Sequence, residues 1–148
     1  TSIRQRVFRT DEAGRFVLRG VASGMGLRLI VAGAWIRPLV RPLEPLRRDE
    51  VRSLGDLEVV PTGDLSVVVH ASDQRRVALV LRIASDRRLP QSPWKTGSEP
   101  LIVRRLTVGE VTVGVYRPSR GSQPELLLRE ARVTIVAGET AELELSIP

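Results

Sequence analysis

The stretch TDEAGRFVLRGVASGMGLRLIV, residues 10–31, points to the fold class of this chain. It places an acidic turn before a run of apolar residues, then a glycine-rich turn, then a second apolar run. In the second run Leu27, Leu29 and Val31 occupy alternate positions, and a period of two is typical of half-buried β-strands. The stretch therefore predicts two strands joined by a turn at residues 23–26.

The same alternation recurs along the chain. Every second residue is apolar and aliphatic over 65–69, 111–115, 133–137 and 143–147. Clusters of Gly, Pro, Ser and Asp separate these runs, as expected for turns. The pattern predicts an all-β protein built from antiparallel β-sandwich modules. The stretch 46–54 has apolar residues at helical spacing, but we expect an irregular turn there, leading into a strand at 56–60.

Composition limits the kinds of protein this chain can be. Its 148 residues suffice for one mid-sized domain or two small ones, and 42% hydrophobic content argues against disorder. Only 3% of the residues are aromatic, so the core must consist mainly of Val, Leu and Ile. The chain has no cysteine, which excludes a disulfide framework, thiolate catalysis and Cys-ligated zinc.

The formal charge is +6, and every basic residue except Lys95 is arginine. We interpret the arginine content as a bias of a GC-rich genome rather than as a phosphate-binding feature. No run approaches the length of a membrane-spanning helix. Residues 1–9 are polar and basic, unlike a signal peptide. Because the first residue is Thr, we expect a fragment or a processed chain.

An internal repeat predicts two modules in tandem. Residues 16–31 resemble residues 101–116, and residues 50–60 parallel residues 132–145, at an offset of about 84 residues. We expect the boundary near 61–63, which gives modules over 1–61 and 62–148. The second module has two further strands ahead of its repeat, LSVVVHA and RVALVLRIA, whereas the first has at best one, over 3–8. The first module is therefore expected to be N-terminally incomplete.

The stretch also resembles a known family, the carboxypeptidase regulatory-like domain, over residues 3–60. That family has a Thr-Asp-x-x-Gly-x-Phe turn and strand, a Gly or Pro turn, and then Leu-x-Val. The matching residues here are Thr10, Asp11, Gly14, Phe16, Gly24, Leu29 and Val31, and LGDLEV at 54–59 fits the last strand. The second copy diverges, with WKTGSEPLIV in place of the motif, but VTIVAGETAELELSI resembles the family's ending.

The resemblance implies a fold and a role. It implies seven-stranded, transthyretin-like or Ig-like sandwiches, which in bacteria occur in strings on surface or envelope proteins and carry no catalytic residues. Physically, Asp11 is expected to cap its turn, Gly14 to take a positive φ, and Phe16 to anchor a strand in the core.

The residues themselves offer little catalytic chemistry. His70 is the single histidine, and its strand parity directs it to solvent or to the outer side of the sheet. Adjacent carboxylates at 11–12 and 49–50 point apart in extended chain. GVASGMG lacks the lysine and the helix of a phosphate loop. Asp11, Glu12 and Asp56 could ligate calcium, but turn capping is the favoured role. We expect no enzyme, no metal and no cofactor.

Two sets of residues are candidates for binding. Arginine pairs at 47–48, 75–76, 87–88 and 104–105 could contact phosphate, although neighbouring acidic residues favour a solvated surface of mixed charge. Aromatic residues could stack on sugars or bases. The candidate ligand or partner contacts are Trp35, Trp94, Tyr116, Arg87 and Arg88.

These observations predict a non-catalytic structural or interaction module of a larger bacterial envelope, surface or assembly protein. Its contacts would be made through loops and open sheet edges. The expected partner is protein: a strand that completes the first module, or neighbouring modules of the same assembly. A carbohydrate-binding accessory module is the alternative, and a nucleic-acid-binding module using the arginine pairs is the third hypothesis.

Overall fold

The computed structural model describes residues 6–72, 77–84, 94–96 and 99–148, and every regular element in these ranges is a β-strand. The all-β prediction is therefore confirmed. In chain order the strands are β1 Leu27–Val31, β2 Leu39–Leu43, β3 Thr62–Ala71, β4 Ala78–Ile83, β5 Trp94–Lys95, β6 Leu101–Thr107, β7 Gly109–Arg117, β8 Leu126–Ile135 and β9 Thr140–Ile147.

The chain divides into two compact units. Unit 1 comprises Thr1–Leu29 and Val40–Asp56, and unit 2 comprises Ile30–Leu39 and Leu57–Pro148. β1 and β2 form a two-stranded sheet, and the division crosses both of its strands. The two modules expected over 1–61 and 62–148 therefore remain a prediction.

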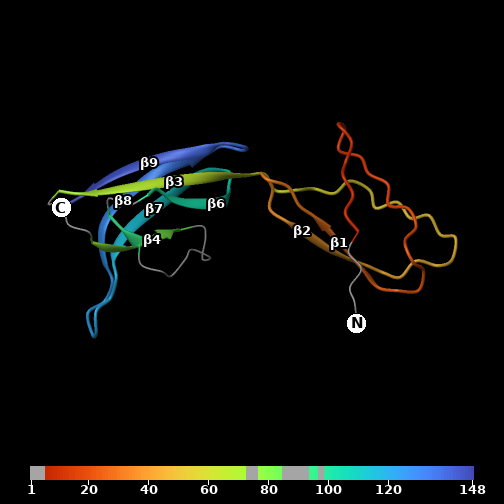
Figure 1. Cartoon of the computed structure of the whole chain (residues 1–148), viewed down its shortest axis with the longest axis horizontal. Coiled ribbons are helices and arrows are strands. Elements are labelled where there is room, and N and C mark those ends of the chain that lie inside the picture. The colour runs from red at the N-terminus through yellow and green to blue at the C-terminus, as the bar shows by residue number, and fades with distance from the viewer. Residues whose placement is uncertain (1–5, 73–76, 85–93, 97–98) are drawn as a thin grey trace. The chain divides into compact units, whose positions relative to one another are not determined.

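Unit 2 contains two sheets that enclose an aliphatic core. One sheet has the strand order β6-β3-β9 and the other has the order β5-β4-β7-β8. In Figure 1, β3 and β9 lie side by side and pass over β4, β7 and β8. The buried cluster draws on both sheets, as expected for a β-sandwich. Its members are Leu65, Val67, Val69, Leu79, Leu81, Ile83, Val103, Leu106, Val111, Val113, Val115, Ile135, Leu145 and Ile147.

Alternation in the sequence explains which side chains fill this core. Leu65, Val67 and Val69 are fully buried, whereas the residues between them are only half-buried. The same pattern holds for alternate residues of β7 and at the end of β9. Full burial of such a side chain contributes about 1.5–3 kcal/mol. The alternating runs at 65–69, 111–115 and 143–147 are thus confirmed as core-forming strands, and the run at 133–137 is confirmed only as far as Ile135, because Ala137 lies exposed in the turn that follows.

One strand pair departs from the expected antiparallel pattern. β3 and β9 are parallel, in a continuous register from Asp64 opposite Thr140 to Ala71 opposite Ile147. β3 and β9 are the first and last strands of the two sheets that form the sandwich. The long connection between them allows the two strands to run in the same direction. The described pairs β3–β6, β4–β5, β4–β7 and β7–β8 are antiparallel.

The first part of the chain has fewer strands than predicted. Residues 6–8, 15–19 and 56–60 contain no strand, although Pro61 forms an isolated bridge with Ile36. Leu57 and Val59 are half-buried and alternate with exposed residues, as a strand would require. A strand also needs a neighbouring segment with which its backbone forms hydrogen bonds. Within the described residues 56–62, only residues 60–62 have such a neighbour. Residues 46–54 form no helix, as expected.

Candidate interaction surfaces

The Asp11 turn of unit 1 has the predicted geometry. Asp11 Oδ1 accepts the backbone N–H groups of Ala13 at 3.0 Å and Arg15 at 2.8 Å, and Gly14 has φ of 74°. The capping role of Asp11 is confirmed. Phe16 is half-buried but lies outside any strand. No group of three or more potential metal ligands occurs among the described residues.

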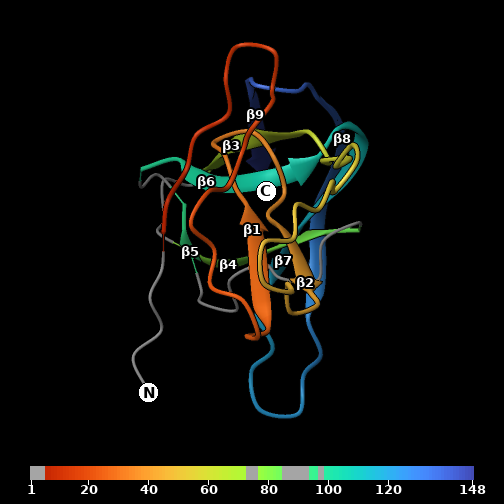
Figure 2. The same cartoon turned by 90° about the vertical axis from the view of Figure 1, so that its right-hand side faces the viewer.

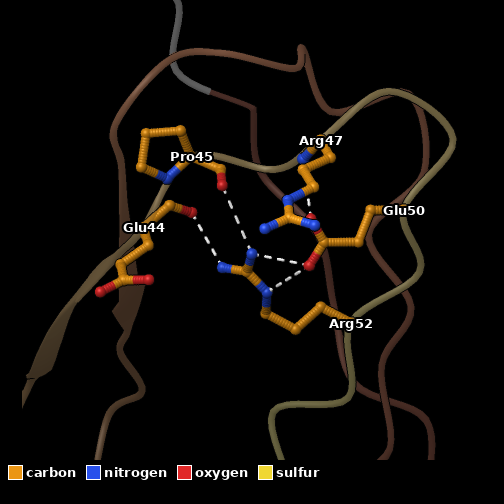
Figure 3. A pocket seen from close by; sticks show the side chains of 5 residues that line it. All are labelled: Glu44, Pro45, Arg47, Glu50 and Arg52. Carbon is orange, nitrogen blue, oxygen red and sulfur yellow. Dashed lines mark hydrogen bonds and ion pairs between the residues drawn. The ribbon is translucent and has the colours of Figure 1, made fainter.

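A hollow of about 630 Å³ lies in the loop that follows β2, lined by Glu44, Pro45, Arg47, Glu50 and Arg52 (Figure 3). The Arg52 guanidinium links the two arms of this loop. It donates to Glu50 Oε1 at 2.8 Å, to the Glu44 carbonyl at 3.0 Å and to the Pro45 carbonyl at 3.3 Å. Arg52 therefore holds the loop closed.

Glu50 completes this network and remains ionised. Its Oε2 accepts the backbone N–H of Arg47 at 2.7 Å, and its own N–H donates back to the Arg47 carbonyl at 3.3 Å. The backbone hydrogen bond from Arg47, followed by that from the Arg52 side chain, lowers the pKa of Glu50. A carboxylate held in this way stabilises a turn and is poorly suited to donate a proton. Glu50 lies three residues after Arg47, whose backbone N–H it accepts, and this is the spacing of the Glu in a capping box. The spacing is visible in the sequence, but the prediction for residues 46–54 did not include it.

Tyr116 lies on the outer face of the four-stranded sheet, directly opposite Val80. It is half-buried, and its ring covers Gly114, since a Cβ built on Gly114 would lie 2.6 Å from Tyr116 Cε2. An aromatic ring laid over a strand glycine protects backbone that would otherwise be exposed. Part of this ring is therefore engaged in packing within the sheet.

Beside Tyr116, Arg82 makes a two-pronged ion pair. It lies opposite Gly114 and donates from Nε and Nη2 to the two oxygens of Glu125, at 3.0 and 2.8 Å. This pairing raises the pKa of Arg82. Glu125 ends the β7–β8 connection, residues 118–125, which extends beyond the sandwich in both views (Figures 1 and 2). The ion pair fixes the base of that connection to β4.

The aromatic candidates lie on separate parts of the structure. Trp35 is 39% exposed, and its carbonyl accepts the N–H of Thr62 at 2.8 Å, so it lies beside the start of β3. Tyr116 belongs to the other sheet. In β5, the backbone of Trp94 pairs with that of Leu79 in β4. The side chain of Trp94 lies outside the described part of the structure, as do Arg87 and Arg88.

The described arginine pairs take part in local structure. In β6 the register shifts opposite Asp64, and Arg105 has φ of 60°, an unfavourable value for a residue with a side chain. Its N–H donates to Asp64 Oδ1 at 3.0 Å, which stabilises this bulge. Arg48 forms an exposed ion pair with Asp49 at 3.9 Å. The pairs at 75–76 and 87–88 lie outside the described residues.

His70 lies near the end of β3 on the outer face of its sheet. It is exposed, as its strand parity predicted, and Ser146 lies beside it in register. Its neighbours in β3, Val69 and Ala71, face the core side. The solvent-facing position of the single histidine is therefore confirmed.

Comparison of the chain with protein-family models, curated proteins and solved structures finds no match. The resemblance to the carboxypeptidase regulatory-like domain therefore stays a prediction. Among the described residues, no helix has the length and apolar character needed to cross a membrane.

Proposed function

We propose that the chain is a non-catalytic structural and interaction module of a larger bacterial envelope, surface or assembly protein, placed at the cell envelope or outside the cell. The observation that carries this proposal is a contrast in burial. Within residues 6–61 no side chain is buried, whereas every buried side chain of the described ranges lies at Thr62 or beyond. Unit 2 has a closed core, and the first part of the chain does not.

The β1–β2 sheet is the feature that a partner would complete. Its apolar side chains are only half-buried, and Ile30 and Val40 remain 55% and 52% exposed. A two-stranded sheet is marginally stable in water by itself, because a third strand or a packed layer is needed to cover its apolar face. A strand supplied by a partner protein or by a neighbouring module would be that third strand and would cover the apolar face.

The charged networks support a structural role. Arg52 and Glu50 close the loop after β2, Arg82 and Glu125 fix the β7–β8 connection, and Asp64 stabilises the bulge of β6. In each case the polar groups satisfy one another or the backbone. Such networks hold loops and strands in fixed positions, which suits a module that presents surfaces to partners.

Hydrogen exchange measured by mass spectrometry tests the proposal. In the isolated chain, we expect amides of β1 and β2 to exchange at least a hundredfold faster than those of β3 and β7, because local opening costs little where no core is buried. As a stand-in for a neighbouring module, a peptide copying residues 64–71 should slow exchange in β1 or β2, and a scrambled peptide should not. Equal protection of β1, β2 and β3 in the isolated chain would contradict the proposal.

Carbohydrate binding is the second candidate, favoured by the 39% exposure of Trp35. Stacking of a sugar on an exposed indole changes its emission. Titration of polysaccharides against tryptophan fluorescence tests this candidate, with Trp35→Ala as the matched variant. A spectrum that does not respond to any polysaccharide removes it.

A further inference from the structure

β9 differs from the other strands that border the two sheets of unit 2. β5 has two residues in the part of the chain that the structure describes, β6 carries the bulge at Arg105, and the register of β8 shifts opposite Val115 and Tyr116. Short strands and bulges are two of the means by which proteins prevent other chains from pairing with an open edge. β9 has neither, because its register with β3 is unbroken over eight residue pairs.

Two hydrogen bonds show which groups of β9 face its open side. The carbonyls of Glu139 and Ile147 accept N–H groups of Asp64 and Ser72, at 2.9 and 3.1 Å. The N–H and C=O of one strand residue point to the same side, and successive residues alternate. Odd-numbered residues of β9 therefore bond to β3, while Glu142, Glu144 and Ser146 direct their backbone groups to the open edge.

The side chains along this edge define the chemistry of a partner. Glu142 and Glu144 are exposed on the outer face of the sheet, about 7 Å apart along the strand. In register they lie beside Ser66 and Val68, and neither carboxylate has an ion-pair partner among the residues the structure describes. A strand with Lys or Arg at alternate positions would place one cation beside each.

We propose that the open edge of β9 binds an extended basic segment of a partner protein, which adds to the β6-β3-β9 sheet as a fourth strand. The backbone groups of Glu142, Glu144 and Ser146 supply the hydrogen bonds, and the two carboxylates select a segment with alternating cations. The proposal rests on the proposed function, since it takes the module to act through sheet edges.

A second copy of the chain is a poor occupant of this edge. Two β9 strands paired antiparallel about Leu143 place Glu142 of each opposite Glu144 of the other. Like charges directly opposite destabilise a strand pair. The same carboxylates that attract a basic segment therefore oppose self-association.

Fluorescence anisotropy with labelled ten-residue peptides tests the proposal on the full chain. One peptide alternates Lys with Val, and the other alternates Glu with Val. We expect the Lys peptide to bind, the Glu peptide to bind at least tenfold more weakly, and the Glu142→Lys/Glu144→Lys variant to reverse this preference. A Glu110→Lys/Glu130→Lys variant, with the same change in net charge on the other sheet, should keep the wild-type preference.

A proline variant separates edge pairing from simple charge attraction. Ser146→Pro removes an N–H that faces the open edge and spares the bonds to β3, so it should weaken the Lys peptide about tenfold and leave the circular dichroism spectrum unchanged. Lack of binding by the Lys peptide, or equal weakening by the Glu110→Lys/Glu130→Lys variant, would overturn the assignment to β9. The exchange rates of β1 and β2 test the proposed function independently of either result.

Discussion

Gly63, the second residue of β3, lies where that strand passes beneath the turn between β8 and β9. A Cβ at this position would overlap the Val136 carbonyl oxygen, and would lie 2.8 Å from Ile135 Cγ2 and 3.0 Å from the Glu139 carbonyl oxygen. Two of these three atoms belong to the backbone, so a rotamer change cannot make room. We therefore predict that Gly63→Ala forces the turn at residues 136–139 away from β3.

The size of the effect follows from these contacts. Overpacking against fixed atoms costs about 2 kcal/mol. The displaced turn also holds two hydrogen bonds to β3, from Gly138 N–H to the Thr62 carbonyl at 3.1 Å and from Asp64 N–H to the Glu139 carbonyl at 2.9 Å. Weakening both adds about 1 kcal/mol. The free energy of unfolding should fall by about 3 kcal/mol, which lowers the urea midpoint by about 2 M at a typical slope.

Gly114→Ala is the matched control in the same unit. Here the added methyl group meets the Tyr116 ring, with Cε2 at 2.6 Å, and that ring can rotate toward solvent. We expect a loss of about 1 kcal/mol. Urea unfolding followed by circular dichroism compares the two variants. If Gly63→Ala unfolds at the same urea concentration as Gly114→Ala, the reasoning from the backbone contacts is wrong.

Three further predictions concern polar groups. Thr62→Val should raise the free energy of unfolding by about 1 kcal/mol, because Thr62 Oγ1 is buried without a partner among the described residues; calorimetry measures this. Asp64→Ala should cost about 1 kcal/mol and Asp64→Asn much less in urea unfolding, since only Asn can still accept the Arg105 N–H. The lowered pKa of Glu50 stabilises its loop at pH values above the ordinary 4.5, and this stabilisation is lost as pH falls through the lowered value. Exchange of the Arg47 amide should show this loss in the wild type and not in Glu50→Gln.

Much of the sandwich could be predicted from the sequence, because burial on one face leaves a period of two. Leu65, Val67 and Val69 show this, as does the exposure of His70. The repeated stretches 50–60 and 132–145 each contain a glycine with positive φ, Gly55 at 65° and Gly138 at 74°. Local physics alone selects such positions, since glycine takes these values without strain.

Other features depend on residues far apart in the chain and left no local signal. Alternation does not encode strand direction, so it could not show that β3 and β9 are parallel. The bulge in β6 places Arg105, rather than a glycine, at φ of 60°, and it is stabilised by Asp64, 41 residues earlier. The run at 16–19 has the composition of a strand but no neighbour to pair with among the described residues.

The parallel register of β3 and β9 has a mechanical consequence. Since both strands run in the same direction, the chain enters this pair beside Thr62 and leaves it beside Ile147, at opposite ends of an interface about 26 Å long. Tension applied at those two points would act along the strands and load all the interstrand hydrogen bonds at once, in shear. A hairpin pulled apart at its open end breaks its bonds one after another at lower force. We therefore expect unit 2 to resist tension applied between Thr62 and Ile147.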